Sequence, residues 1–258
     1  MRLMKRILSA AAVLALSASL LVGCSSGTAS SVPVSASSAA ESTVSSVEET
    51  ASSAVDENEA AAAQLLNDLT GSYQELWPVI LADEYKQTWL DDCTALVGED
   101  NAEAAFEKLS SMVTGDVYGE DAVKAYANGG GAYFCGFTNS LAILTFDGET
   151  STISGTDKDG NVLFSHAYHY IGMEPVRGLY EFESDDADSG EFTYFFLAPD
   201  TSAETYHIEF RYGSVAEALS QYDAGEYAYW LASGISTDCD QTMIDNCIEL
   251  FCTENLAG

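Results

Sequence analysis

A histidine and a glutamate alternate with apolar residues in one short segment, His207-Ile208-Glu209-Phe210-Arg211-Tyr212-Gly213. The alternation predicts a β-strand, because side chains two residues apart lie on the same face of a strand. His207 and Glu209 would then be about 7 Å apart along the strand, within reach of one shared ion. Imidazole nitrogen and carboxylate oxygen are both donors that zinc accepts. The segment therefore predicts part of a zinc site.

The chain has two other histidines, His166 and His169, in a second alternating segment at residues 162–171. Three residues apart on a strand, they lie on opposite faces, so at most one of them can face the same side as His207. We expect each to be a hydrogen-bonded residue of the fold unless it completes the site. The candidate metal ligands are therefore His207, Glu209, His166 and His169, with another carboxylate or water in any remaining position.

The sequence gives little support for catalysis. It has no G-x-S-x-G, no P-loop, no G-x-G-x-x-G after a strand and no H-E-x-x-H. It also has no C-x-x-C pair, which argues against a zinc ribbon and a thioredoxin-type centre. We expect a protein that is not an enzyme.

The first residues predict where the protein works. A basic start, Met1 to Arg6, precedes an apolar run, Ile7 to Leu20, and then Leu21-Val22-Gly23-Cys24, which fits a lipobox. Residues 1–23 are thus predicted to be a lipoprotein signal peptide, with Cys24 acylated and the chain anchored on the extracytoplasmic face of the cell membrane. The alternative is a secretory signal with an incidental cysteine.

Residues 24–55 are predicted to be a disordered tether. After Cys24 they consist almost entirely of Ser, Ala, Thr, Val and Glu, with no aromatic, Lys or Arg residue. Such a segment buries too little apolar surface to offset its ordering entropy. The remaining residues, 56–258, are enough for one domain with a core of its own.

The charge of the chain is strongly acidic, with 9 Lys and Arg against 41 Asp and Glu. Loss of Arg2, Lys5 and Arg6 with the signal peptide would leave 6 basic residues and a net charge of −35. Nucleic acid is therefore excluded as a partner, since phosphate contacts need a basic face. The acidity attracts cations, or it serves only to keep an exported protein soluble.

Five cysteines follow Cys24, an odd number for an exported domain: Cys93, Cys135, Cys239, Cys247 and Cys252. Two disulfides with one free thiol, or buried thiols alone, both fit, and the spacing does not choose among the pairings. Cys247 and Cys252 share a predicted helix but lie about 140° apart around it, so they do not easily face one partner.

The period of apolar residues predicts the remaining elements. Helices are expected at 58–67, 102–113, 215–222 and 240–254. Strands are expected at 132–137, 141–146, 150–154, 162–171, 179–183, 192–197 and 206–212, joined by turns rich in Gly, Asp and Asn. Successive short hairpins favour a mainly β fold, an antiparallel barrel with additional helices.

Two connections between these strands are acidic. Residues 157–161, Asp-Lys-Asp-Gly-Asn, look faintly like a calcium loop but lack its later glutamate, so a hairpin turn is expected. Residues 183–191 are expected to form a solvated loop, or a rim that draws cations toward the site.

Several segments, in the same order, resemble the ZinT family, an extracytoplasmic zinc-binding domain found alone or fused to zinc-uptake lipoproteins. The segments are Leu69 to Pro78, Arg177 to Glu183, Phe192 to Phe196 with Ala198-Pro199, His207 to Gly213, and Glu226 to Trp230.

The resemblance implies a calycin-like barrel that captures zinc outside the membrane and works beside the binding protein of a zinc ABC importer. His207 falls on the first histidine of the family's strand motif, and Glu209 on the second. A further family histidine falls near Phe195, where this chain has no histidine. The alternative is the same barrel without metal, binding a small ligand or a protein partner through aromatic residues such as Tyr194, Phe196, Tyr212, Tyr229 and Trp230.

Overall fold

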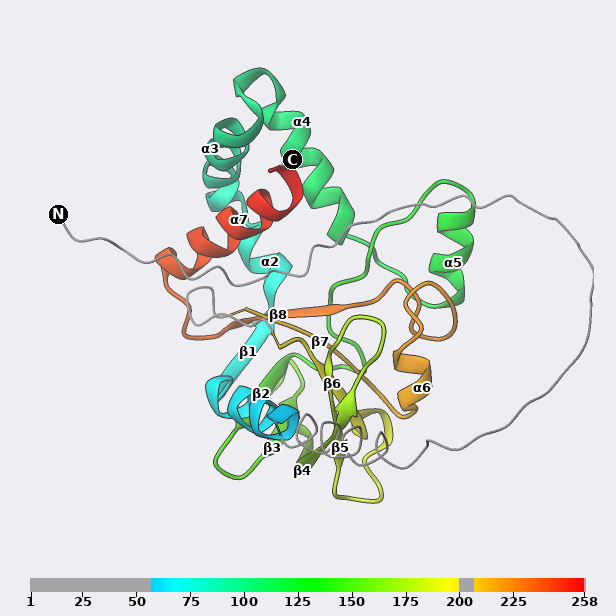
Figure 1. Ribbon diagram of the computed structural model, residues 1–258. Helices are drawn as coiled ribbons and strands as arrows, with labels where there is room; N and C mark the ends of the chain where they lie inside the picture. Colours follow the sequence, from blue (N-terminus) through cyan, green and yellow to red (C-terminus); the bar gives the residue numbers. More distant parts are fainter. Residues whose placement is uncertain (1–56, 200–206, 258) are drawn as a thin grey trace, which may run out of the picture. The chain divides into compact units, whose positions relative to one another are not determined.

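Eight antiparallel strands close into a barrel, each paired with its neighbours in chain order. The computed structural model describes residues 57–199 and 207–257, all within one compact unit (Figure 1). The strands are β1 (Gly71–Glu75), β2 (Ile143–Asp147), β3 (Thr152–Thr156), β4 (Val162–Met173), β5 (Tyr180–Ser184), β6 (Tyr194–Leu197), β7 (His207–Gly213) and β8 (Ala232–Ser236). The pairing of β1 with β8 closes the ring. The predicted calycin-like antiparallel barrel with added helices is confirmed.

The barrel interior is filled by aromatic side chains. On β7 the alternate residues Ile208, Phe210 and Tyr212 point inward and are almost completely buried. The ring of Phe195 stacks on both Phe210 and Tyr212, with centroids 6.3 and 5.3 Å away. Apolar alternation thus places one face of each strand in the core and leaves the other face outside the barrel.

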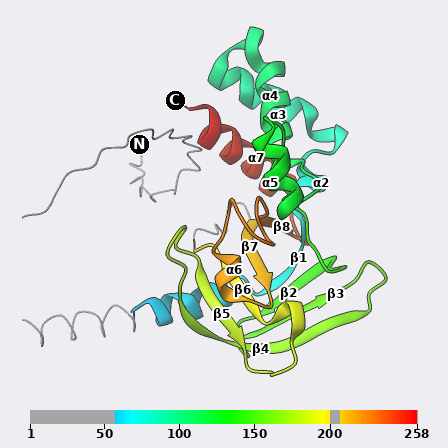
Figure 2. The ribbon, with the colours of Figure 1, turned by 90° about the vertical axis from the view of Figure 1, so that its right-hand side faces the viewer.

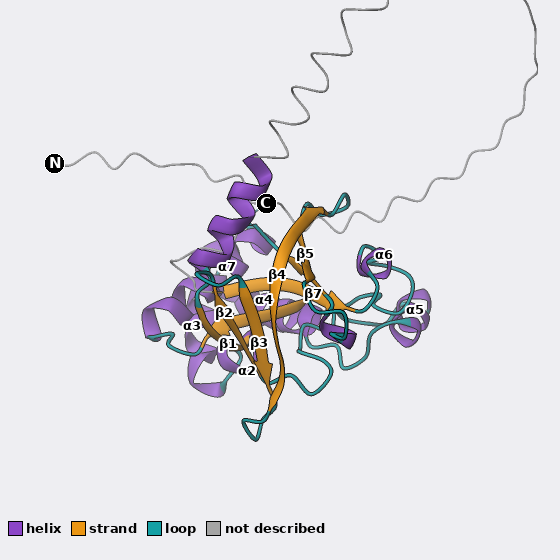
Figure 3. Ribbon diagram, turned by 90° about the horizontal axis from the view of Figure 1, so that it is seen from below, coloured by secondary structure: helices purple, strands orange, loops and turns teal. Residues whose placement is uncertain are grey.

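The helices lie outside the barrel. One covers residues 57–68, and the others are α2 (Leu76–Ile80), α3 (Lys86–Val97), α4 (Glu99–Val113), α5 (Glu120–Ala127), α6 (Ala216–Leu219) and α7 (Gln241–Leu256). Asp240 caps α7, since its carboxylate accepts a hydrogen bond from the backbone N–H of Met243. Figure 3 shows α5 and α6 together on one side of the barrel.

A second core joins four of these helices to the barrel. Trp77, Trp89 and Phe251, from α2, α3 and α7, pack with Leu109 of α4 and with Ile235, which projects outward from β8. Figures 1 and 2 show this helical layer at one end of the barrel. The outer faces of β7 and β8 are therefore covered by protein where they approach α2 and α7.

Most of the predicted elements are present. Six of the predicted strands correspond to β2 to β7, and the four predicted helices correspond to the helix at 57–68, α4, α6 and α7. The predicted strand at 132–137 is wrong: Phe134 alone forms isolated bridges, to Thr114 and Trp230. Strands β1 and β8 and helices α2, α3 and α5 were not predicted.

The predicted signal peptide, Cys24 and the tether lie outside the described residues. Within residues 57–199 and 207–257, no helix is long and apolar enough to cross a membrane.

Candidate metal site

His207 and Glu209 lie at the start of β7, on the outer face of the barrel. Their neighbours Ile208 and Phe210 point into the core, so the two polar side chains point the other way. In register with them on β8 are Ile235, opposite His207, and Ser233, opposite Glu209. Both polar side chains are half-buried because helices cover this part of the barrel.

The two side chains open into one small cavity between β7 and the helices α2 and α7. Its volume is about 30 Å³, enough for an ion or one to two water molecules. The lining residues are Leu76, Trp77, Ile80, His207, Glu209, Cys247, Leu250, Phe251 and Glu254. His207 and Glu209 therefore converge on a common space, as their spacing predicts.

Helix α7 closes the cavity with one of its faces. Cys247, Leu250, Phe251 and Glu254 follow the i, i+3, i+4, i+7 spacing that places helix residues on one side. Glu254, in the last turn, is exposed and adds a second carboxylate. Glu254 was not among the ligands predicted from the sequence. The one sequence feature that points to it is its i+7 position relative to Cys247 on the same helix face.

Trp77 forms part of the cavity wall and lies beside Cys135. The residue is 8 % exposed, and its indole N–H is buried. Burial raises the pKa of the Cys135 thiol, and a hydrogen bond between the indole and that thiol partly opposes this effect. The nitrogen and oxygen ligand groups that line the cavity are therefore those of His207, Glu209 and Glu254.

Two thiols lie close to the carboxylates. Burial, and next the negative charge of Glu209, raise the pKa of Cys135 to about 12. Burial raises the pKa of Cys247, which lines the cavity, to about 12 as well. Both thiols are therefore protonated at neutral pH while no metal ion is bound.

The other two histidines lie at the opposite end of the barrel. Strand register aligns His169 with Glu183, Glu183 with Tyr194, and Tyr194 with Gly213, the last residue of β7. Six residues of strand separate Gly213 from His207, which corresponds to about 20 Å. The structure therefore does not bring His169, or its near neighbour His166, to the cavity.

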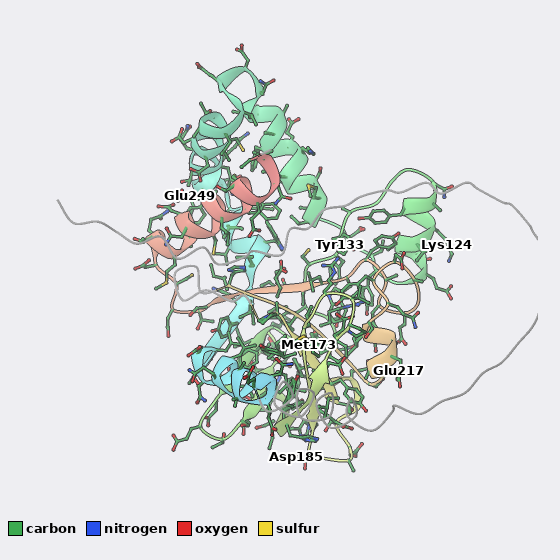
Figure 4. The ribbon with its side chains drawn as sticks, viewed as in Figure 1. Lys124, Tyr133, Met173, Asp185, Glu217 and Glu249 are labelled. Atoms are coloured by element: carbon green, nitrogen blue, oxygen red, sulfur yellow. The ribbon has the colours of Figure 1, made fainter. Side chains whose placement is uncertain are left out.

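Both of these histidines instead contact the acidic connection at 183–191. The Nδ1 atom of His166 lies 2.7 Å from Asp186, and the Nδ1 atom of His169 lies 2.7 Å from Asp185. Figure 4 shows Asp185 at the far end of the barrel from Glu249 on α7. Asp185 and Asp186 of the acidic connection are therefore paired with histidines at this end of the barrel, away from the cavity.

The turn at residues 157–161 closes without an ion. One carboxylate oxygen of Asp157 accepts the backbone N–H groups of Asp159 and Asn161, each at 2.9 Å, and the other accepts the Asn161 side-chain amide at 2.8 Å. These bonds, the Asn161 side chain first, lower the pKa of Asp157. The segment forms the hairpin turn expected from its sequence.

As the side chains stand, no three His, Cys, Asp or Glu groups of the described residues are gathered closely enough to hold a metal ion. His207 and Glu209 share the cavity with Glu254, but a complete donor set requires a side-chain movement. Glu254 is the exposed member of the three, and an inward rotation of its side chain would complete the donor set.

Comparison with known proteins gives distant structural similarity only. No protein-family model and no curated protein matches the chain. The Zn(II)-bound ZinT-like domain of Streptococcus pneumoniae AdcA is similar with a TM-score of 0.45 and 15% identity, over 71% of this chain and 89% of that domain. Zn(II)-bound AdcA from the same organism is similar with a TM-score of 0.42 and 14% identity, over 72% of this chain and 35% of that one.

Proposed function

We propose that this protein is an extracytoplasmic zinc-binding protein that captures the ion in the cavity between β7 and α7. His207 would supply a nitrogen ligand, and Glu209 and Glu254 would each supply an oxygen ligand. The observation that carries the proposal is the shared cavity. The imidazole of His207 and the carboxylate of Glu209, which lie on the same face of β7, both line one ion-sized space. The helix that closes this space bears a further carboxylate.

The donor set fits zinc better than calcium or magnesium. Zinc combines imidazole and carboxylate ligands in a four-coordinate site, whereas calcium and magnesium prefer six or more oxygens. A cavity of about 30 Å³ with one imidazole does not offer such an oxygen cage. Three protein ligands leave a fourth position for water.

Glu254 gives the site a means of loading and release. Its side chain is exposed at the end of α7, so it can turn inward when an ion binds between His207 and Glu209. A site with an open position holds metal less tightly than a closed four-ligand site. This arrangement suits a protein that hands its ion to another.

The cellular setting of the proposal rests on the sequence. The lipobox at Cys24 would anchor the protein on the outer face of the membrane, and residues 24–55 would act as a tether. The segments that resemble the ZinT family support a role beside the binding protein of a zinc ABC importer. Zinc would then be cargo, and the role would be binding without catalysis.

No observation favours the alternative of a small ligand inside the barrel. Of the aromatic residues proposed to hold it, Phe196, Tyr212 and Trp230 are fully buried in the core. Tyr212 contacts Trp230 with ring centroids 5.0 Å apart. These rings pack against one another and belong to the barrel core.

The proposal is tested by calorimetric titration of zinc into tag-free protein that begins at residue 24, in which Cys24→Ser prevents lipidation. We expect one saturable zinc site per chain. His207→Ala and Glu209→Gln should each weaken binding by roughly a hundredfold, and Glu254→Gln by roughly tenfold because water can replace a flexible ligand.

Two matched variants serve as controls. His169→Ala removes a histidine about 20 Å along the sheet from His207, and Glu249→Gln removes an exposed carboxylate from α7 outside the cavity. Neither should change the zinc affinity. Absence of saturable binding in the unmodified protein, or an equal loss in His169→Ala, would refute the proposed site.

A further inference from the structure

Two cysteines that are far apart in the sequence meet in the helical core. The sulfur atoms of Cys93, on α3, and Cys252, on α7, lie 3.9 Å apart, although 159 positions separate them in the chain. Both residues are completely buried. The sequence alone left the pairing of the cysteines open, and this contact distinguishes one pair.

The packing around the two thiols holds the helices at this distance. The Trp89 ring, one turn before Cys93, contacts the Phe251 ring beside Cys252 with centroids 6.0 Å apart. The Trp89 indole N–H also donates to the carbonyl of Ile80 at 2.7 Å. A disulfide requires sulfurs about 2.05 Å apart, so the atoms must approach by roughly 2 Å. Side-chain rotation with a small shift of one helix would have to supply that approach.

We infer that Cys93 and Cys252 form a disulfide in the exported protein, which cross-links α3 to α7. Exported domains keep disulfides because their surroundings are oxidising. A bond that closes so long a loop restricts the unfolded chain strongly. The inference rests on the extracytoplasmic location proposed above and does not depend on zinc binding.

The oxidant required is another disulfide, such as oxidised glutathione or a disulfide-bearing oxidoreductase. One protein thiolate attacks it, so that a mixed disulfide forms and one reduced thiol leaves. The second protein thiolate then attacks the protein sulfur of the mixed disulfide. The Cys93–Cys252 bond forms, the second reduced thiol leaves, and two electrons pass to the oxidant as both protein thiols lose their protons.

Burial of the two thiols determines at which stage of folding the disulfide forms. It raises the pKa of both thiols, Cys93 and Cys252, so little thiolate exists once α7 has docked against α3. The bond should therefore form rapidly during folding and slowly in protein that has folded in the reduced state.

The cross-link would fasten the helix that forms one wall of the cavity. Phe251 and Glu254, which line it, lie on either side of Cys252 in α7. Fraying of the last helical turns, which would carry Glu254 away from β7, should therefore be reduced in the oxidised protein.

The test is to refold the Cys24→Ser chain in a glutathione redox buffer and to compare it with protein kept reduced. After denaturation and alkylation, we expect the oxidised chain to leave Cys93 and Cys252 unmodified and to yield one peptide linked through them. Its thermal midpoint should exceed that of the reduced protein by about 5 °C or more.

Two sets of variants separate the bond from other effects. Cys239→Ser changes a partly exposed cysteine and should leave the cross-link and the thermal shift intact. Cys93→Ala and Cys252→Ala should each abolish the shift; if either fails to fold, peptide mapping of the unmodified chain still decides. Full alkylation of Cys93 and Cys252 after oxidation, or a link between other cysteines, would overturn the inference.

Discussion

His207 and Glu209 share the outer face of β7 with Arg211, yet the two ends of the strand are covered in different ways. At the first end, side chains of α2 and α7 cover the strand and leave a cavity. At the other end, Arg211 has no exposed surface. Its guanidinium donates to the carbonyl groups of Leu219 and Tyr227, and more weakly to Gln221 at 3.4 Å.

The covering of Arg211 is made by backbone and by one aromatic ring. The Tyr222 ring lies against the guanidinium, 4.4 Å from its centre, and also contacts Arg177 at 4.3 Å. Among the described residues, no carboxylate forms an ion pair with Arg211, and its Nε–H has no hydrogen-bond partner. Arg211 is therefore held as a structural cation that fastens the segment from 214 to 231.

Strand parity alone therefore does not decide whether an outward-facing polar residue binds a ligand or stabilises the fold. All three polar residues alternate correctly with the core residues, and all three face outward. Over His207 and Glu209, side chains of α7 at intervals of three and four residues leave a space. Over Arg211, the segment from 214 to 231 brings its backbone carbonyl groups against the guanidinium and leaves no space. The end of β7 that carries His207 and Glu209, the open end, suits exchange of a ligand. The end that carries Arg211, the sealed end, suits stability.

The largest effect should come from Arg211→Met, which breaks the sealed end. The substitution leaves the buried carbonyl groups of Leu219 and Tyr227 without this donor, and we expect a loss of roughly 3–5 kcal/mol in the free energy of unfolding. Urea denaturation followed by circular dichroism measures it. The folded fraction should still bind zinc, and a loss below about 1 kcal/mol would show that the carbonyl contacts contribute little.

A smaller effect is expected at Tyr222, which separates packing from hydrogen bonding. Tyr222→Leu removes the ring that contacts both guanidinium groups and should cost about 2 kcal/mol. Tyr222→Phe keeps the ring and loses the hydroxyl group, which donates a long hydrogen bond of 3.4 Å to Glu174 and also interacts with the Arg211 guanidinium, so it should cost about 1 kcal/mol. Equal losses in the two variants, in the same urea experiment, would assign the effect to the hydroxyl group.

The sequence predicted the barrel because most of its strands carry a strong signal. Alternating large apolar residues and turns with Gly, Asp or Asn mark β2 to β7. Strand β8, Ala-Ser-Gly-Ile-Ser, lacks that signal because its inward residues are small, and β1, Gly-Ser-Tyr-Gln-Glu, lacks it because Tyr73 is its one large apolar residue. The segment at 132–137 alternates as a strand does, but Phe134 alone forms bridges there, since β1 and β8 already pair with each other.

Of the candidate site, the sequence predicted the two residues that local strand geometry brings together and not the residue that comes from a distant helix. His207 and Glu209 are two residues apart, so local geometry already brings them to one face. Glu254 comes from a helix 45 positions beyond Glu209 in the sequence and is an ordinary exposed glutamate until the helix docks. The sequence also could not place His166 and His169, because strand register depends on the bulges within β4.

The counterpart of Arg211→Met at the open end is Glu209→Met, with the same replacement on the same face of the same strand. Methionine fits the apolar part of the cavity wall, and Glu209 is only half-buried, so we expect a change in unfolding free energy below about 1 kcal/mol. Zinc binding should be lost. A destabilisation as large as that of Arg211→Met would remove the distinction between the two ends.

The smallest expected effect concerns Cys135, whose pKa reports the charge at the open end. Burial and then Glu209 raise this pKa from the ordinary thiol value of 9.0 to about 12. Because the folded-state pKa lies above that of an exposed thiol, the associated stabilisation is present below pH 9 and is lost as the pH rises toward 12. Glu209→Gln should lower this pKa, and bound zinc should act in the same direction.

Alkylation by iodoacetamide at pH 9, quantified for each cysteine by mass spectrometry, measures this effect. In Glu209→Gln the Cys135 peptide should react faster than in the unmodified protein, because more of the thiol is ionised. Cys247 provides the internal control, since burial is the main cause of its raised pKa and Glu209 is not among the causes. A parallel increase at Cys247 would indicate general opening of the fold, whereas an increase at Cys135 alone would show that Glu209 carries its charge into the wall of the cavity, where a cation would bind.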